Sequence, residues 1–254
     1  MDTEKKDGLL DAWTTEDGLT VYRYGRTDST NLRAKEAAYS HPNGALFIAK
    51  GQSAGRGRLG RSFYSPDDTG LYFSCLYQTE SPLYLHLALT PAVAVVCARA
   101  IEKYCEKKVG IKWVNDLYYE GKKVCGILVE SVCGSDGQDK NGLIVGVGIN
   151  LQTVEFPGEL SGIAGSLGVG IDCDKMALDI YRTLERYVLD PSDRSFMKEY
   201  TERSILLSKP VKLLKGEECI CGTVIGFDCD GGIVLDIDGE RKAFHGGEIT
   251  LRLQ

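Results

Sequence analysis

A glycine- and arginine-rich segment limits the folds that this chain can adopt. Residues 51–61 hold four glycines and three arginines. Gly55, Gly57 and Gly60 satisfy the G-x-G-x-x-G pattern of dinucleotide-binding folds, and the same stretch matches a phosphate-loop pattern in which arginine replaces lysine. Both patterns need a helix directly after the last glycine, because the helix N-terminus binds the phosphate. The residues that follow predict a turn and then a strand, with no helix before Thr79, so the sequence excludes both standard nucleotide-binding folds.

The arginines of this loop still favour an anion-binding role. Arg56, Arg58 and Arg61 lie close together, and a guanidinium group binds phosphate or carboxylate through two parallel hydrogen bonds. The alternative is a solvated basic loop, which is common. The chain carries a formal net charge of −6, and three mutually repelling cations on a flexible backbone are better explained by a bound anion. We therefore favour a ligand loop over a solvated one.

The overall composition narrows the class of protein. With 254 residues, 43% of them hydrophobic, the chain can bury a core as one large domain or as a large and a small one. An acidic chain binds nucleic acid poorly without a local basic patch, so no nucleic-acid partner is expected. No apolar run reaches the roughly 18 residues of a membrane span, and residues 1–10 lack the apolar core of a secretory signal. We expect neither a membrane anchor nor secretion.

The nine cysteines favour a reducing compartment. Their number is odd and no CxxC pair occurs, so we expect free thiols in a cytoplasmic protein, used as small core residues. Cys219 and Cys221 lie two apart in a strand-like run, and we expect both to face inward. A partial metal site that adds Cys229 is the weaker alternative.

Hydrophobic patterns and turn residues predict a strand-rich first region. Strands are expected at residues 20–24, 45–49, 70–77, 111–119, 123–132 and 142–151. Helices are expected after the capping residues 28–31, from an N-cap at Thr90, from an N-cap at Asp174, and briefly around Tyr200. The helix that follows Thr90 has the clearest 3.6-residue period.

The pattern changes at Lys209 and Pro210. Short strands are predicted at residues 211–214, 219–227, 232–237 and 249–253, separated by turns at 228–231 and 238–239. This all-β module of about 45 residues has the size of a small barrel. We place a domain boundary near Ser208, which predicts domains at residues 1–207 and 208–254.

A second group of charged residues follows the glycine-rich loop. Strand alternation predicts Lys112, Val114 and Asp116 on one face of the strand at residues 111–119, with Lys123 at the start of the return strand. A lysine at the start of an apolar strand can extend its amine to solvent. It can also enter a cleft beside the arginines, and the residues alone leave both options open.

Five segments, in order along the chain, resemble one known family. They are DSTN (residues 28–31), Gln52 with GRGRLGR (55–61), KWVND (112–116), KVCGILVE (123–130) and GVGINL (146–151). Together they resemble biotin protein ligase, which biotinylates the carrier protein of acetyl-CoA carboxylase. HGGEITL (245–251) resembles the C-terminal barrel of that family, so the resemblance spans about residues 20–254. Val114 departs from the usual proline, and Leu59 stands where some members carry a further arginine.

The resemblance implies an α+β fold. A mixed β-sheet flanked by helices, like that of class II aminoacyl-tRNA synthetases and biotin–lipoate ligases, would form the catalytic domain, followed by an SH3-like β-barrel. The strand-rich pattern agrees, since a doubly wound sheet needs more strand–helix alternation. The implied activity is ATP-dependent ligation of biotin to a lysine of a biotin carboxyl carrier protein, belonging to acetyl-CoA carboxylase or a related carboxylase, through biotinyl-5′-AMP. The implied enzyme is cytoplasmic, and a monomer or a ligand-promoted homodimer.

The resemblance also implies site residues. Step one brings a carboxylate against a polyphosphate, so cations must offset the repulsion; Arg58, Arg61 and Lys123 are the catalytic candidates. Mg²⁺ would sit on the phosphates with Asp116 as its protein ligand. The candidate biotin- and ATP-binding residues are Ser29, Thr30, Asn31, Gln52, Arg56, Gly57, Arg58, Phe63, Lys112, Trp113, Asn115, Lys123, Gly126 and Asn150. Trp113 would be an apolar wall, or simply core.

Three alternatives stay open. A lipoate or octanoate ligase or transferase shares the superfamily but lacks the GRGRLGR pattern. A regulator that senses biotinyl-AMP would carry a DNA-binding domain of roughly 50–60 residues, whereas 27 residues precede Asp28. A non-enzymatic anion-binding module would not need the ordered segments around Lys112 and Lys123.

Overall fold

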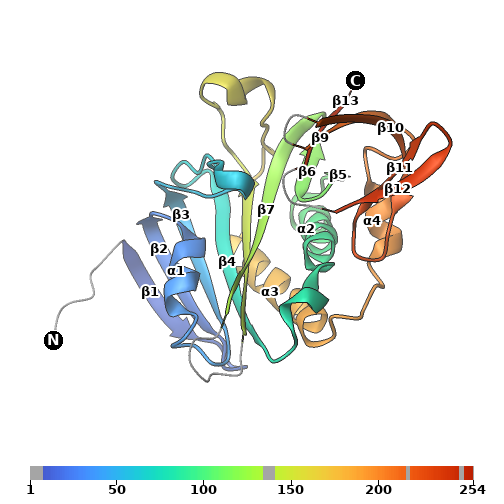
Figure 1. The fold of residues 1–254 in the computed structure, drawn as a ribbon. Helices are drawn as coiled ribbons and strands as arrows, with labels where there is room; N and C mark the ends of the chain where they lie inside the picture. The colour runs from blue at the N-terminus through green and yellow to red at the C-terminus, as the bar shows by residue number, and fades with distance from the viewer. Residues whose placement is uncertain (1–7, 134–140, 216–217, 246–248, 254) are drawn as a thin grey trace.

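The computed structural model describes residues 8–133, 141–215, 218–245 and 249–253. Over these ranges the chain forms two sheets, an eight-stranded one in the order β1-β2-β3-β4-β8-β7-β6-β5 and a five-stranded one in the order β12-β11-β10-β9-β13 (Figure 1). The strands of the large sheet are β1 (Leu9–Thr14), β2 (Thr20–Thr27), β3 (Ala45–Gln52), β4 (Gly70–Thr79), β5 (Gly110–Lys112), β6 (Asp116–Tyr119), β7 (Lys122–Val132) and β8 (Asn141–Asn150). The strands of the small sheet are β9 (Pro210–Lys215), β10 (Glu218–Phe227), β11 (Ile233–Ile237), β12 (Glu240–Phe244) and β13 (Ile249–Leu253). The helices are α1 (Thr30–Ala37), α2 (Leu89–Cys105), α3 (Cys173–Leu189) and α4 (Met197–Arg203).

The large sheet is mixed and covered on both faces. Its β2–β3 pair is parallel, and its other pairs among the described residues are antiparallel. Helix α1 packs on one face through Ala34 and its C-cap Ala38, against Phe47. Helices α2 and α3 pack on the opposite face, where the alternating side chains Leu46 and Ile48 point (Figure 1). This arrangement confirms the predicted α+β fold.

Helix α2 is the buried centre of the molecule. It begins at Leu89 with Ala88 as its N-cap, so the predicted cap at Thr90 was wrong by two residues. By length and composition, the helical stretch Leu83–Cys105 is the one part of the described chain that could cross a membrane, but 72% of its window is buried inside the structure. It serves as a core helix.

Helix α3 has the predicted buried face but a different cap. Met176, Ile180 and Leu184 are buried against the core. The N-cap is Asp172, whose Oδ1 accepts the backbone N–H of Lys175 at 3.1 Å. The predicted cap Asp174 lies inside the first turn.

The predicted strand at residues 111–119 is confirmed only at its two ends. It is split into β5 and β6, which pair antiparallel with Lys112 opposite Asp116, so Trp113, Val114 and Asn115 form a turn. Two hydrogen bonds hold this turn to Ile127 of β7: Asn115 Nδ2 donates to its carbonyl at 2.7 Å, and its N–H donates to the Asn115 carbonyl at 3.0 Å. Strand alternation cannot detect a tight reversal without glycine or proline. Opposed residues share a face, so Lys112 and Asp116 still lie together.

The small sheet is antiparallel, consistent with the expected SH3-like barrel. Its buried residues Val211, Val224 and Ile233 continue the core of the large sheet. Cys219 and Cys221 are exposed, contrary to expectation. The alternate set of residues in β10, which includes the buried Val224, faces inward instead. Residues 246–248 of the HGGEITL segment lie outside the described residues, and the boundary near Ser208 stays a prediction.

Candidate functional site

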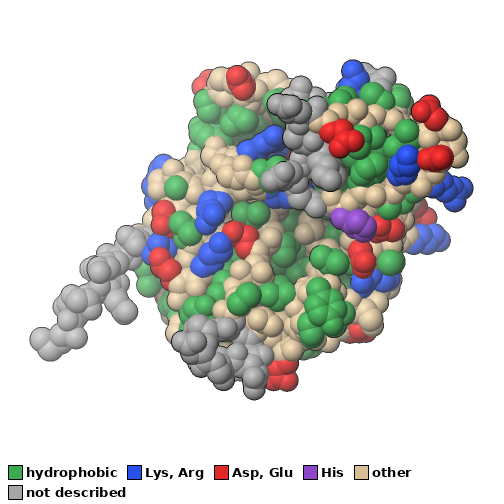
Figure 2. Space-filling view, in the orientation of Figure 1, with side chains coloured by type: hydrophobic (Ala, Val, Ile, Leu, Met, Phe, Trp, Pro, Cys, Tyr) green, Lys and Arg blue, Asp and Glu red, His purple; other side chains and the backbone are tan. Residues whose placement is uncertain are grey.

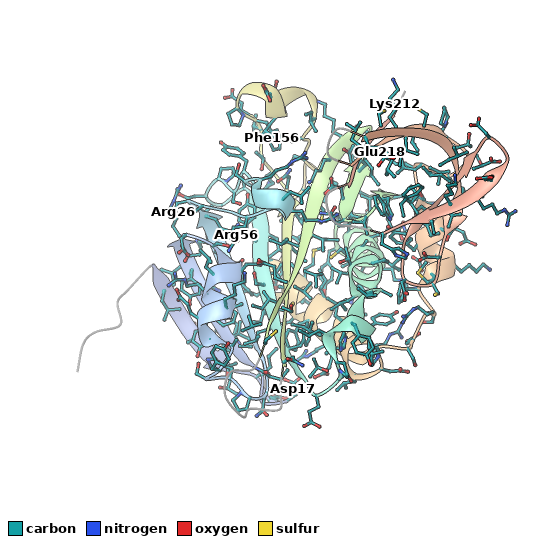
Figure 3. The ribbon with its side chains drawn as sticks, viewed as in Figure 1. Asp17, Arg26, Arg56, Phe156, Lys212 and Glu218 are labelled. Atoms are coloured by element: carbon teal, nitrogen blue, oxygen red, sulfur yellow. The ribbon has the colours of Figure 1, made fainter. Side chains whose placement is uncertain are left out.

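A cavity of about 440 Å³ opens where α1, the glycine-rich loop and strands β5 to β8 meet. Figure 2 shows Lys and Arg side chains spread over this face of the molecule, several of them over the large sheet, and Arg56 is labelled beside that sheet in Figure 3. The predicted site residues that line the cavity are Ser29, Thr30, Asn31, Gln52, Arg56, Gly57, Arg58, Arg61, Phe63, Lys112, Trp113, Asn115, Asp116, Lys123 and Gly126.

The cavity is strongly basic although the protein is acidic. Among the described residues that line it, Asp116 is the only carboxylate, set against five cations: Arg56, Arg58, Arg61, Lys112 and Lys123. Burial lowers the pKa of Lys112; neighbouring Asp116 raises it in part and Lys123 lowers it further. Burial also lowers the pKa of the Arg58 guanidinium, against the opposing effect of Asp116. Crowded, partly buried cations favour a bound anion.

Asp116 is the centre of what we call the cationic end, made of Arg58, Lys112, Asp116 and Lys123. Lys123 Nζ lies 2.6 Å from Asp116 Oδ1, and the two side chains are 28% and 24% exposed. Arg58 Nη1 donates to Asn115 Oδ1 at 3.3 Å. Lys123 therefore enters the cavity, and the option that its amine extends to bulk solvent is wrong.

The glycine-rich loop is ordered by its own backbone. Gly57 N donates to Arg61 O at 2.7 Å, and Phe63 N donates to Gly55 O at 2.8 Å, with a 3-10 turn at Arg58–Gly60 between them. Gly60 has φ +72°, which favours glycine. The next strand of the described chain is β4, so the predicted absence of a helix after this loop is confirmed.

Phe63 lies on a floor of glycines. A Cβ added at Gly126 of β7 or Gly148 of β8 would come within 2.9 Å or 2.4 Å of the Phe63 ring. A Cβ at Gly146 would lie 2.0 Å from Asn31 Oδ1. Sequence reasoning assigned no role to Gly146 and Gly148. Alternate glycines in a buried strand are the signal that could have found them, since such glycines often mark close approach of another group.

What we call the neutral end consists of Ser29, Thr30, Asn31 and Gln52 around the start of α1. Gln52 Oε1 accepts the backbone N–H of Thr30 at 2.9 Å. Ser29 is the N-cap of α1, yet its side chain makes no capping bond. The short polar groups are thus held next to the cavity by the helix start and by strand β3.

Two predicted site residues, Asn150 and Trp113, are almost fully buried. Asn150 does not line the cavity: it is 3% exposed, and its Nδ2 donates to Gly165 O at 2.9 Å. Its Oδ1 has no hydrogen-bond partner within the described ranges. Trp113 is 7% exposed, and its indole N–H donates to Gly231 O at 2.7 Å. Trp113 is therefore both cavity wall and core, and it connects the site to the small sheet.

The connection between β8 and α3 supplies lining residues that sequence reasoning missed. It runs beside β7, where Lys123 N donates to Ile163 O and Gly165 N donates to Lys123 O, both at 2.9 Å. Leu160 and Ile163 line the cavity from this segment, near Phe156 at the top of Figure 3. Nothing in the sequence pattern pointed to them, because the segment lacks periodicity.

The site fits a metal ion only in company with phosphate. Across the described residues there is no group of three or more His, Cys, Asp or Glu side chains that could hold a metal. Mg²⁺ is usually held by one or two carboxylates together with substrate phosphates and water. Asp116 is one such carboxylate, and it is already paired with Lys123. The donor set is suited to a metal that arrives with a nucleotide.

Comparison with known proteins identifies relatives over nearly the whole chain. The sequence model of the Biotin/lipoate A/B protein ligase family matches residues 24–150. The bifunctional ligase/repressor BirA of Escherichia coli is 32% identical over 246 residues, covering 93% of this chain and 75% of that protein. The biotin–[acetyl-CoA-carboxylase] ligase of Paracoccus denitrificans is 27% identical, covering 88% of this chain and 97% of that protein.

A solved structure agrees with these relatives. The biotin protein ligase from Aquifex aeolicus, in complex with biotin and ATP, superimposes with a TM-score of 0.74 and 33% identity. The match covers 92% of this chain and 99% of that one. Half of the chain matches the family's sequence model, and 92% of it is covered by the match to a solved biotin ligase. The chain therefore belongs to the Biotin/lipoate A/B protein ligase family.

Proposed function

We propose that this chain is a biotin protein ligase. It joins biotin to a specific lysine of a biotin carboxyl carrier protein, through biotinyl-5′-AMP, and converts ATP to AMP and pyrophosphate. The observation that carries the proposal is the charge of the cavity in an acidic protein: among its described lining residues, five cations face one carboxylate, Asp116, next to a neutral polar end. The carboxylate of an acid and the phosphates of a nucleoside triphosphate together would balance this excess of positive charge.

The first step is formation of the adenylate. The biotin carboxylate attacks the α-phosphate of ATP and pyrophosphate leaves, so two anions must approach each other. Arg58, Arg61 and Lys123 offset the repulsion and stabilise the charge that develops in the transition state. Mg²⁺, held on the phosphates with Asp116 as a protein ligand, would further neutralise the leaving group.

The neutral end is suited to the ring system of biotin. Ser29, Thr30 and Gln52 offer short hydroxyl and amide groups to the ureido ring. Phe63 and Trp113 provide apolar wall for the remainder of the ligand. This assignment places the biotin carboxylate toward Lys123 and the α-phosphate.

The nucleotide is assigned to the side of Asn115 and Asn150. Asn115 is fixed by its bonds to Ile127 and Arg58. The buried Asn150 Oδ1 is without a partner in the described chain, and an unsatisfied buried acceptor destabilises a structure by about 1–3 kcal/mol. Asn150 does not line the cavity, however, so its part in nucleotide binding stays a prediction, and the assignment rests on Asn115.

The second step transfers biotin to the carrier protein. The lysine amine of the acceptor attacks the carbonyl of the mixed anhydride, an amide bond forms and AMP leaves. No covalent bond to the enzyme is required. All nine cysteines are free, as in a reducing compartment, which supports a cytoplasmic location.

An ATP–pyrophosphate exchange assay tests this function. Purified enzyme is incubated with ATP, labelled pyrophosphate and one acid at a time: biotin, lipoate or octanoate. We expect exchange with biotin and at most weak exchange with the other two acids. Equal or faster exchange with lipoate or octanoate would assign the chain to another activity of the same family.

A further inference from the structure

We infer that Glu130 is a positioning residue that fixes the direction of the protons in a buried hydrogen-bond chain at the neutral end. We call this chain of four side chains, Glu130, Asn31, Ser74 and Thr30, the polar relay. The inference rests on the proposed function and extends it, because it identifies what makes the neutral end selective for a ligand with N–H donors.

The polar relay runs from Glu130, which does not line the cavity, to Thr30, which does. Asn31 Nδ2 donates to Glu130 Oε2 at 2.9 Å. Ser74 Oγ lies 2.5 Å from Asn31 Oδ1 and 2.7 Å from Thr30 Oγ1. Ser74 is fully buried, and Thr30 is 3% exposed. Three of these side chains are thus shielded from bulk water, so their protons must be shared among themselves.

Glu130 sets the direction because an ionised carboxylate only accepts hydrogen bonds. Burial alone would raise the pKa of its carboxyl, but hydrogen bonds from Lys35 and Asn31 outweigh burial and hold the pKa below its ordinary value. Asn31 must therefore turn its NH₂ group to Glu130 and its oxygen to Ser74. The opposite orientation would place the amide oxygen against a carboxylate.

The remaining protons follow from this orientation. The single hydroxyl proton of Ser74 goes to Asn31 Oδ1, so the Thr30 hydroxyl must donate to Ser74 Oγ. Gln52 Oε1, which accepts the Thr30 backbone N–H, is a second and more distant acceptor for the Thr30 hydroxyl at 3.2 Å, so the Thr30 proton is engaged inside the protein with either partner. With its proton engaged, the Thr30 hydroxyl offers only lone pairs to the cavity. It accepts an N–H donor of the ligand, which the ureido ring has and a plain fatty acid lacks.

The position of Asn31 is fixed from other sides as well. Gly146 leaves no room beyond Asn31 Oδ1, since even a Cβ there would lie at 2.0 Å. Lys35 Nζ holds the second oxygen of Glu130 at 2.6 Å, and Arg56 Nη2 lies 3.9 Å from the same atom. Glu130 Oε1 thus faces a cation while Oε2 faces Asn31. The carboxylate cannot rotate away from this orientation without losing one of these partners.

The substitution Glu130→Gln tests the direction of the relay. Lys35 will retain the amide oxygen, which leaves the glutamine NH₂ group facing the Asn31 NH₂ group, donor against donor. Ser74→Ala breaks the same relay one residue further along. For each variant we expect the biotin KM in pyrophosphate exchange to rise roughly tenfold, while the ATP KM stays within about twofold, as one buried hydrogen bond is disrupted.

The double variant Glu130→Gln/Ser74→Ala distinguishes a connected hydrogen-bond chain from a general destabilisation of the site. If both residues act through one chain, the combined rise in biotin KM will be clearly smaller than the product of the single effects. Glu36→Gln, a change at an exposed carboxylate of α1 that pairs with Arg33, is the matched control and should leave both KM values unchanged.

The outcomes separate the inference from the proposed function. A selective, non-additive rise in biotin KM supports the polar relay. Parallel rises in the KM for biotin and ATP, or an unchanged biotin KM in both single variants, would overturn it while the parent enzyme still exchanges with biotin. A parent enzyme without biotin-dependent exchange would contradict the proposed function itself.

Discussion

The two ends of the cavity hold their residues in different ways. At the neutral end, the side chains of Thr30 and Asn31 are buried and joined by directional hydrogen bonds to Ser74 and Glu130. At the cationic end, the charged groups are partly exposed and come from a loop and a hairpin, as the pair Lys123–Asp116 shows. The difference suggests a division of work: the neutral end selects the acid, and the cationic end activates it.

Removal of the Lys123 amine should have the largest effect on catalysis at the cationic end. In Lys123→Ala we expect the adenylation rate to fall by roughly 10²–10³, because one cation that faces developing charge is lost. Single-turnover formation of biotinyl-AMP measures the rate. Lys122→Ala is the matched control, since the Lys122 amine lies on the exposed side and donates to Ser161 O at 3.2 Å. Near-normal adenylation in a folded Lys123→Ala protein would remove Lys123 from the catalytic group.

Gly148→Ala should disturb the apolar part of the cavity wall that Phe63 forms. The new methyl group would lie 2.4 Å from the Phe63 ring, which must move. Overpacking of this kind costs about 1–3 kcal/mol, and we expect it as a loss of biotin affinity of roughly tenfold or more in calorimetry. Gly162→Ala, where a Cβ meets nothing within 4 Å, should bind biotin normally. Equal affinities in the two variants would mean that Phe63 does not shape the biotin site.

Arg58→Gly should separate binding of the acid from retention of the adenylate. Arg58 contacts Asn115 at the cationic end, so we expect its loss to weaken retention of biotinyl-AMP by roughly tenfold and binding of free biotin less, since a charged contact is removed. Mass spectrometry of a bystander protein, incubated with enzyme, biotin and ATP, measures escaped adenylate as acylated lysines. If the variant makes adenylate yet labels no more bystander lysines than the parent, Arg58 is not the retaining group.

The glycine-rich loop should show the smallest effect. Its short backbone pairing is offset by repulsion among Arg56, Arg58 and Arg61, so ligands that neutralise these cations should favour the closed loop. We expect trypsin to cut at these arginines several-fold more slowly with biotin plus ATP than without ligand. Equal cleavage rates at saturating ligand would show that the loop is no lid and that its glycines serve only a tight turn.

The sequence could predict much of the cationic end. Lys112, Asp116 and Lys123 follow one another closely along the chain, and strand alternation placed the first two on one face correctly. It missed the reversal at Trp113–Asn115, because no glycine or proline marks the turn. The metal role of Asp116 remains a prediction.

The support of the neutral end could not be predicted in the same way. Asn31 and Glu130 lie 99 residues apart in sequence, and Ser74 lies 43 from Asn31. Their contact depends on β4, β7 and α1 packing together, which no local pattern encodes. Gly146 and Gly148 were visible as alternate glycines, but only the packed Asn31 and Phe63 side chains explain them.

The central claim, that the cavity activates biotin for transfer to a carrier lysine, is tested most directly by intact-mass spectrometry of an acceptor. A biotin carboxyl carrier domain is incubated with the enzyme, biotin and ATP, then digested to locate the modified residue. We predict one biotinyl group on one lysine, formed only when ATP is present and lost with Lys123→Ala. An acceptor that stays unmodified under conditions that support biotin-dependent pyrophosphate exchange, or one modified at many lysines by the parent enzyme, would contradict this account.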